Sequence, residues 1–106
     1  MLPQNRTATH PGQILLHEFL NPLGQTQSRL AEHLGVPVQR INELVRGKRG
    51  VTPDTAWLLS QAFETSPEFW MNLQNNHDLS ISKPKRHVPK FAPNKALQAD
   101  SASRSR

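Results

Sequence analysis

Strong helix start and stop signals follow one another at short intervals along most of this chain. Residues 52–54, Thr-Pro-Asp, combine a capping hydroxyl, a proline that suits the first helical turn and a carboxylate at the positive end of the helix dipole. Residues 66–68, Ser-Pro-Glu, repeat that signal, while Gly35 stands where a left-handed residue commonly closes a helix and Gly47 ends another. Because no stretch shows the two-residue alternation of a strand, the sequence predicts an all-α domain of short helices.

Five helices are predicted from apolar residues that recur at three- or four-residue spacing, as one buried helix face requires. The first follows residues 10–12 and ends at the breaker group 21–24, the second begins after the N-cap Thr26, and the third runs from Pro37 to Arg46. The fourth and fifth follow the two proline signals. The apolar residues that recur in the five predicted helices, in chain order, are Leu15, Leu16, Phe19 and Leu20; Leu30, Ala31 and Leu34; Ile41, Leu44 and Val45; Ala56, Leu59 and Phe63; and Phe69, Trp70 and Leu73.

Charge is distributed unevenly along the chain. The 106 residues carry a net charge of +5, but residues 1–79 hold six Lys or Arg against seven Asp or Glu, whereas residues 80–106 hold seven against Asp100 alone. The second segment also scatters prolines and serines without a sustained period, a composition typical of disorder. We therefore predict a flexible N-terminus at 1–9, one folded domain at 10–79 and a basic, disordered tail at 80–106.

The composition argues against several classes of function. The chain has no cysteine, which excludes disulfides, thiolate zinc sites and thiol catalysis. Its five histidines form no His-Glu-x-x-His pattern, and the neighbouring His77 and Asp78 lack a nucleophile beside them. Glycine-rich phosphate loops, membrane-length apolar runs and the apolar segment of a signal peptide are all absent from the sequence. We expect a cytoplasmic protein that is not an enzyme and needs no cofactor or metal.

The second and third predicted helices, joined by a tight turn at Gly35, have the spacing of a helix-turn-helix, whose second helix enters the DNA major groove. One side of the third predicted helix is apolar and the other side is polar. Gln and Asn can bond adenine, Arg can bond guanine, and Val can pack on a thymine methyl. The predicted base-reading residues are Val38, Gln39, Arg40 and Asn42, and the predicted phosphate contacts are Gln27, Arg46, Lys48 and Arg49.

An ordinary solvated surface helix is the alternative interpretation. Gln, Asn and Arg are common on protein surfaces, and Glu43 stands three residues from both Arg40 and Arg46, with which it could form a helical ion pair. The folded part of the chain is nearly neutral, unlike most general nucleic-acid binders. From spacing alone, both interpretations stay open.

Three motifs carry a resemblance to a known family: HPGQIL at residues 10–15, RINELVRGKRGVTPDTA at 40–56 and SPEFWMNLQNNHDL at 66–79. With them, residues 10–79 resemble the HigA-type antitoxins of the XRE (Cro/CI-like) helix-turn-helix family. The resemblance implies a five-helix bundle of the lambda-repressor-like type and a homodimeric repressor that binds a palindromic operator ahead of its own toxin–antitoxin operon. It also implies a partner, a RelE/HigB-like mRNA-cleaving toxin, and the same four base-reading residues.

Contacts with a second protein are predicted on the last two helices. The resemblance assigns the fifth helix to dimer packing, through Phe69, Trp70 and Leu73, while ordinary packing within one chain is the alternative for all three. Trp57 and Leu58 fall outside the inward stripe of the fourth helix and are better candidates for an external contact. Relatives commonly carry a charged residue where this chain has Leu58, so the substitution enlarges an apolar patch.

The basic tail is the second departure from the family pattern, since such antitoxins often stop soon after the fifth helix. A RelE-like toxin is itself basic, so the tail is predicted to contact DNA phosphates rather than the toxin, with an idle extension as the alternative. Two alternatives to an antitoxin also stay open. One is a stand-alone regulator of the same fold without a toxin partner, and the other is an interaction module whose third helix is only solvated.

Overall fold

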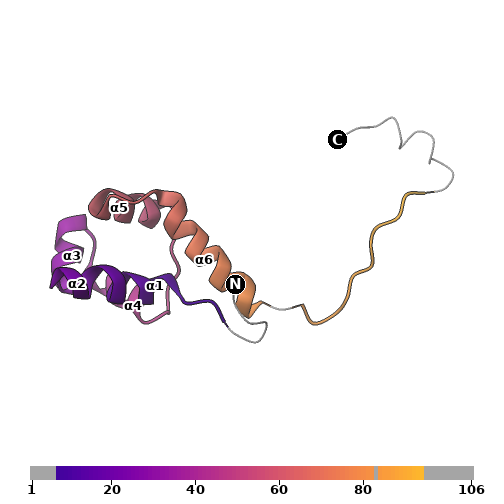
Figure 1. Cartoon of the computed structure of the whole chain (residues 1–106), viewed down its shortest axis with the longest axis horizontal. Coiled ribbons are helices and arrows are strands. Elements are labelled where there is room, and N and C mark those ends of the chain that lie inside the picture. The colour runs from indigo at the N-terminus through magenta and orange to yellow at the C-terminus, as the bar shows by residue number, and fades with distance from the viewer. Residues whose placement is uncertain (1–6, 83, 95–106) are drawn as a thin grey trace.

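A computed structural model describes residues 7–82 and 84–94 of the chain. The helices are α1 (Pro11–Ile14), the π-helical stretch η1 (Leu15–Leu20), α2 (Asn21–Leu23), α3 (Gln27–Leu34), α4 (Val38–Val45), α5 (Pro53–Phe63) and α6 (Pro67–Ile81). Because α1, η1 and α2 follow one another without a break, they form one continuous helical rod. The described residues therefore form five such rods, which Figure 1 shows. Within the described ranges no strand occurs, which confirms the predicted all-α class.

Local capping explains why the helices begin where they do. The hydroxyls of Thr26, Thr52 and Ser66 accept hydrogen bonds from backbone N–H groups three residues later, at 3.1, 3.4 and 3.0 Å. His10 caps the first rod through a nearer N–H, because its Nδ1 accepts from the Gly12 N–H, two residues later, at 2.9 Å. The sequence predicts the three hydroxyl caps but not the histidine cap.

The first rod ends within the predicted breaker group 21–24, at its last residue. It passes through Asn21 and Pro22 and ends only at Gly24, whose φ is +65°. Within the rod the Asn21 N–H donates to the Leu16 carbonyl, five residues earlier, which is the wider bonding of a π-helix. The wider turn comes just before Pro22, whose ring in an α-helix would meet the carbonyl four residues earlier.

Two predicted boundaries differ from the structure. Pro37 is the N-cap of α4 rather than part of its first turn, because its ψ of 143° is extended, and Arg46 caps the other end. At the end of the domain, α6 continues to Ile81, two residues beyond the predicted boundary at Leu79.

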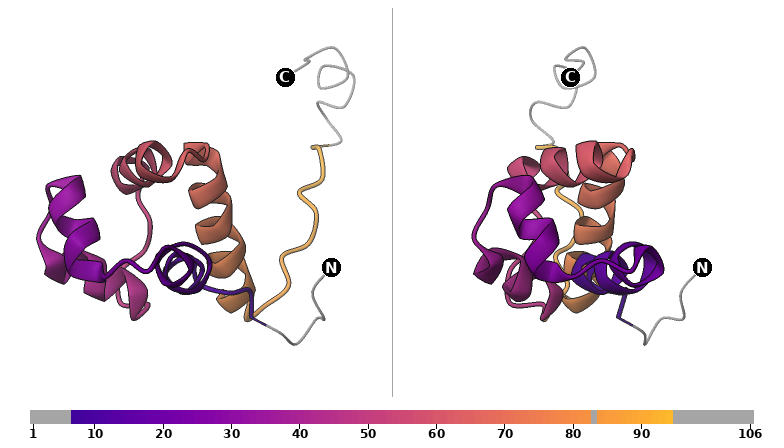
Figure 2. Two further views of the ribbon diagram at one scale, coloured as in Figure 1. Left: turned by 60° about the vertical axis from the view of Figure 1, so that its left-hand side comes forward. Right: turned by 90° about the vertical axis from the view of Figure 1, so that its left-hand side faces the viewer.

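The core lies where the five rods meet. Its fully buried large side chains are Trp70, Leu15, Leu20, Ile41, Leu44 and Leu59. Trp70 anchors one end of this core, with ring centroids 5.1 Å from both Phe19 and Phe69, and its Nε1–H donates to the Thr65 hydroxyl at 2.8 Å. The first rod is seen end-on in the left view of Figure 2, with α4 on one side and α6 on the other.

Two contacts fix the first rod against its neighbours. A Cβ added to Gly12 would overlap the Leu44 carbonyl oxygen and lie 2.6 Å from the Leu44 carbonyl carbon, so α1 packs directly on the backbone of α4. Beside it, the Gln13 Nε2 donates to the Val45 carbonyl at 2.9 Å. These contacts set the position of α4, the helix that the sequence assigns to DNA.

The segment just before the first rod contacts α6. Ala8 is buried, its N–H donates to the Ser80 hydroxyl at 3.0 Å, and its carbonyl lies 2.8 Å from the His77 Nδ1. Ala8, within the segment predicted to be flexible, thus contacts α6 at two points, whereas residues 1–6 lie outside the described part. In the predicted tail, residues 84–94 are exposed and contain no helix or strand, while residue 83 and residues 95–106 lie outside that part. Of the described helices, none is both long enough and apolar enough to cross a membrane.

Candidate nucleic-acid interface

Helices α3 and α4 form the helix-turn-helix that the sequence predicts. Gly35, at φ +75°, closes α3, and the N–H groups of Gly35 and Val36 both donate to the Ala31 carbonyl, at 2.9 and 3.0 Å. The chain then turns through Pro37 into α4. Because Ile41, Leu44 and Val45 are buried, the opposite side of α4 faces outward.

Three of the four predicted base-reading residues lie on this outward side. Val38 is 41 % exposed, Gln39 is exposed and Asn42 is half-buried. Their positions within the first two turns of α4 bring them to one face of the helix.

Arg40 differs from its prediction, because its guanidinium turns toward the start of α5. Its Nη2 donates to the Asp54 carboxylate at 2.9 Å and to the Thr55 hydroxyl at 2.6 Å, and only 25 % of the side chain is exposed. In this conformation Arg40 joins α4 to α5 and is not free to reach a base. The sequence could not indicate this partner, which lies fourteen residues later in the chain.

Glu43 also pairs with a different arginine from the two that the sequence suggests as helical ion-pair partners. Instead of Arg40 or Arg46, it pairs with Arg49, whose Nε and Nη2 donate to its Oε1 at 3.1 and 2.9 Å. Its other oxygen, Oε2, accepts from the Gln39 Nε2 at 3.3 Å. The hydrogen bonds from Arg49 are the main reason why the pKa of Glu43 lies below its usual value.

The predicted phosphate contacts lie at both ends of the motif. Gln27 is half-buried at the start of α3, while Arg46 and Lys48 are exposed just after α4. Arg49 is held by Glu43, with about half of its side chain exposed. The turn that carries Arg46 to Arg49 passes through Gly47 at φ +77°, and the Lys48 N–H donates to the Glu43 carbonyl at 2.8 Å.

The residues predicted to contact a second protein divide into two groups. Trp57 and Phe69 are exposed, at 57 % and 36 %, and Leu58 is half-buried. Leu73 packs against the core, and Trp70 is completely buried. The predicted partner contact is therefore wrong for Trp70, because the rings around it and its bond to Thr65 enclose it within one chain.

Two further apolar side chains on α6 were not predicted from the sequence. Leu79 and Ile81 are 74 % and 57 % exposed. Ile81 lies beyond the helix boundary that the sequence predicts at Leu79, because the composition changes near residue 80. Leu79 lies within the predicted helix but is not among the apolar residues predicted to contact a partner.

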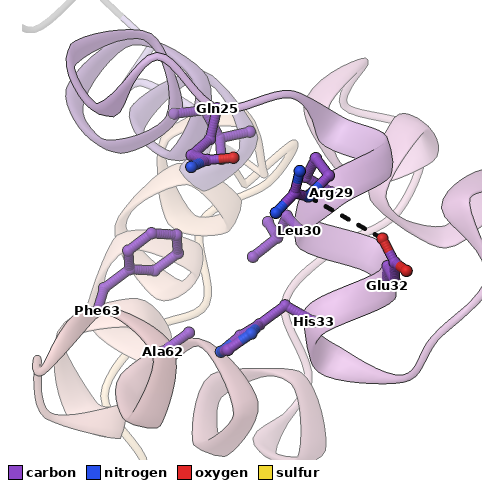
Figure 3. A pocket seen from close by; sticks show the side chains of 8 residues that line it. Gln25, Arg29, Leu30, Glu32, His33, Ala62 and Phe63 are labelled. Atoms are coloured by element: carbon purple, nitrogen blue, oxygen red, sulfur yellow. Dashed lines mark ion pairs between the residues drawn. The ribbon is translucent and has the colours of Figure 1, made fainter.

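A hollow of about 650 Å³ opens between the α2–α3 turn, α3 and α5 (Figure 3). None of the residues predicted to contact DNA lines it. The ion pair drawn at its rim, between Arg29 and Glu32, is 4.0 Å long and largely exposed, so it contributes little to stability. The residues around the hollow are Leu20, Gln25, Arg29, Leu30, Glu32, His33, Ala62 and Phe63.

Two of the histidines, His10 and His77, make contacts within the fold. His10 and His77 meet edge to face, with ring centroids 4.8 Å apart, at the junction of the N-terminal segment and α6. Burial is the main reason why the pKa of His10 lies below its usual value of 6.5. Across residues 7–82 and 84–94, no three His, Asp or Glu side chains gather closely enough to hold a metal ion.

Comparison with known proteins agrees with this geometry. The helix-turn-helix family model matches residues 16–70, which is more than half of the chain. The chain is 43 % identical over 76 residues to virulence-associated protein I of Dichelobacter nodosus, covering 72 % of this chain and 70 % of that protein. It is 39 % identical over 80 residues to antitoxin HigA-1 of Vibrio cholerae, covering 74 % of each.

Solved structures of similar proteins include complexes with DNA. The PA4674 protein of Pseudomonas aeruginosa, in complex with its 18-bp operator DNA, superposes with a TM-score of 0.68 at 41 % identity, covering 71 % of this chain and 80 % of that one. Antitoxin GraA in complex with its operator superposes with a TM-score of 0.70 at 32 % identity, covering 100 % of this chain and 97 % of that one.

Proposed function

The chain belongs to the XRE-type helix-turn-helix family of DNA-binding regulators, and from this premise we propose that it is the antitoxin of a toxin–antitoxin module. In this proposal it binds a specific operator through α4, represses its own operon and neutralises a RelE-like, mRNA-cleaving toxin. Members of the family are regulators rather than enzymes. Operator binding would place the protein in the cytoplasm.

The observation that carries DNA recognition is the outward face of α4. It presents an exposed amide, Gln39, and a half-buried one, Asn42, beside the apolar Val38, and it is followed by the exposed cations Arg46 and Lys48. Amides and an apolar group are suited to base edges, whereas the cations are suited to phosphates. Two similar proteins have been solved with their operators, which supports the same use of this motif here.

A homodimer is part of the proposal, because palindromic sites are read by symmetric pairs of recognition helices. The exposed side chains of Trp57, Phe69, Leu79 and Ile81 offer apolar surface on α5 and α6 for such an interface. These exposed side chains, together with the similarity to antitoxin HigA-1, support binding both to a second copy of this chain and to a toxin protein.

The basic tail is proposed to add contacts to the DNA backbone. Its described cations, Lys85, Arg86 and Lys90, are exposed on an extended segment that leads away from α6 (Figure 1). Each phosphate that such a cation neutralises adds about 0.9 to the dependence of log affinity on log salt.

The experiment that tests DNA recognition is a fluorescence-anisotropy titration of the chain with the DNA upstream of its own gene and with a scrambled duplex of equal length. The wild type should prefer its upstream DNA, and Asn42→Ala should lose that preference while it keeps its fold. Equal affinity of the wild type for both duplexes would refute the proposal.

The experiment that tests neutralisation is co-expression with the protein encoded next to it. A growth defect caused by that protein alone, and relieved by this chain, is the expected result. Operator binding without such relief would favour the second candidate, a stand-alone regulator. That candidate has support from PA4674, a structural neighbour described only by its operator.

A further inference from the structure

One carboxylate on the outward side of α4 holds two of the residues assigned to DNA. Glu43 accepts from Gln39 through Oε2, at 3.3 Å, and from Arg49 through Oε1, at 3.1 and 2.9 Å. Gln39 lies one helical turn before Glu43, whereas Arg49 reaches it from the turn after α4. The carboxylate therefore connects a predicted base reader with a predicted phosphate contact.

The backbone of Glu43 also binds the turn of residues 46–49 that carries Arg49. Its carbonyl accepts the Lys48 N–H at 2.8 Å, and Gly47 at φ +77° allows the chain to double back. Because the side chain and the backbone of one residue both bind the turn, the position of Arg49 relative to Gln39 is determined by Glu43.

Stabilisation of the fold does not account well for this network. The side chains of Arg49 and Glu43 are 49 % and 32 % exposed, and ion pairs at such positions contribute little to folding because water screens them. The network instead orders two long side chains that would otherwise sample many rotamers. Ordering them before binding removes part of the cost of ordering them on DNA.

We propose that Glu43 is a positioning residue for DNA recognition, one that orients the Gln39 amide toward a base edge and Arg49 toward the neighbouring phosphate. This inference rests on the proposed function. An ionised carboxylate only accepts hydrogen bonds, so it fixes the Gln39 amide with its nitrogen toward Glu43 and leaves the carbonyl oxygen and the second N–H free. Those two groups are the pair that a bidentate contact with adenine uses.

Arg49 keeps donors for DNA in the same arrangement. A guanidinium has five N–H groups, and the contacts with Glu43 occupy its Nε and one side of Nη2. The carboxylate also cancels the positive charge of Arg49, which weakens its attraction to DNA of any sequence. Glu43 thus favours oriented binding over non-specific binding.

The test is in vitro selection of duplexes from a random pool by the wild type, Glu43→Gln, Gln39→Ala and the double variant. Glu43→Gln keeps the size of the side chain but can no longer fix the direction of the amide. We expect Glu43→Gln to lose preference at the same base position that Gln39→Ala loses, with a fall of about fivefold, the lower end of the discrimination from one bidentate contact. In the double variant the loss should equal that of Gln39→Ala alone, because the two residues act together.

The matched control is Glu18→Gln, which removes an exposed carboxylate from η1 and should leave the selected motif unchanged. Thermal melting should show both single carboxylate variants folded. If Gln39→Ala loses a base position that Glu43→Gln retains, the positioning role is overturned while the proposed function stands. If the wild type selects no motif at all, the proposed function fails, and the positioning role fails with it.

Discussion

Replacing Gly12 with alanine tests the contact that holds α4, the helix proposed to bind DNA, in place. The added Cβ would lie 2.6 Å from the Leu44 carbonyl carbon and 2.9 Å from the Val45 Cα, whereas carbon atoms normally approach to about 3.5 Å. Since both neighbours are backbone atoms, α1 and α4 must separate by roughly 1 Å. Overpacking of this kind costs about 1–3 kcal/mol and occasionally more.

The helical preference of alanine works in the opposite direction and contributes at most about 1 kcal/mol. We therefore expect Gly12→Ala to lower the free energy of unfolding by about 2 kcal/mol, which for a domain of this size lowers the melting temperature by about 10 °C. Circular dichroism melting at 222 nm measures this shift, and anisotropy on operator DNA should show weaker binding.

Gly35→Ala provides the comparison for that result. No atom lies within 4 Å of the Cβ it would add, so its only cost is the left-handed backbone at φ +75°, about 1 kcal/mol. A Gly12→Ala variant that melts at or above the temperature of the wild type would refute the close packing of α1 on α4.

Three further predictions concern the core, the histidine cap and the tail. Trp70→Ala should lose about 3–5 kcal/mol of stability in thermal melts, because it leaves a cavity at a buried position. Trp57→Ala removes an exposed side chain, so this variant should melt like the wild type but associate with itself more weakly in analytical ultracentrifugation. Burial, and then repulsion from His77, lower the pKa of His10 below 6.5, while the nearby Asp78 acts in the opposite direction. Because the folded state disfavours protonated His10, its contribution to folding stability is complete above pH 6.5 and declines as the pH falls toward the folded-state pKa. Melts between about pH 7.5 and 5.5 should therefore show a smaller pH dependence for His10→Ala than for the wild type. Truncation after Ser82 should reduce the salt dependence of non-specific DNA affinity by about 0.9 for each phosphate that the tail neutralises, and an unchanged slope would mean that the tail neutralises none.

Local signals made the helices predictable from the sequence. A hydroxyl cap acts on an N–H three residues away and a glycine closes its own turn, so Thr26, Thr52, Ser66 and Gly35 could be assigned without knowledge of the fold. The histidine cap was missed because His10 is not among the usual capping residues.

The misassigned side chains depend on contacts between distant segments. Arg40 was assigned to bases because it lies on α4, but Asp54 and Thr55 at the start of α5 hold it. Trp70 is adjacent to Phe69 on the helix predicted to bind a partner, so the sequence does not separate the two residues. The packing of three phenylalanine rings around Trp70 shows that it belongs to the core. The spacing of apolar residues along one helix identifies which face is buried. The partner of each long side chain, in contrast, depends on which other segments the tertiary fold brings next to it.

The central claim is that the outward side of α4 meets DNA, and the most direct measurement is a titration of the isotope-labelled chain with its operator duplex, followed by amide chemical shifts in NMR spectra. The account predicts that the largest shifts fall on Gln39, Asn42 and residues 46–49, and that they differ between operator and scrambled DNA. Shifts confined to residues 84–94, or equal for both duplexes, would contradict it and would make the tail the source of the attraction.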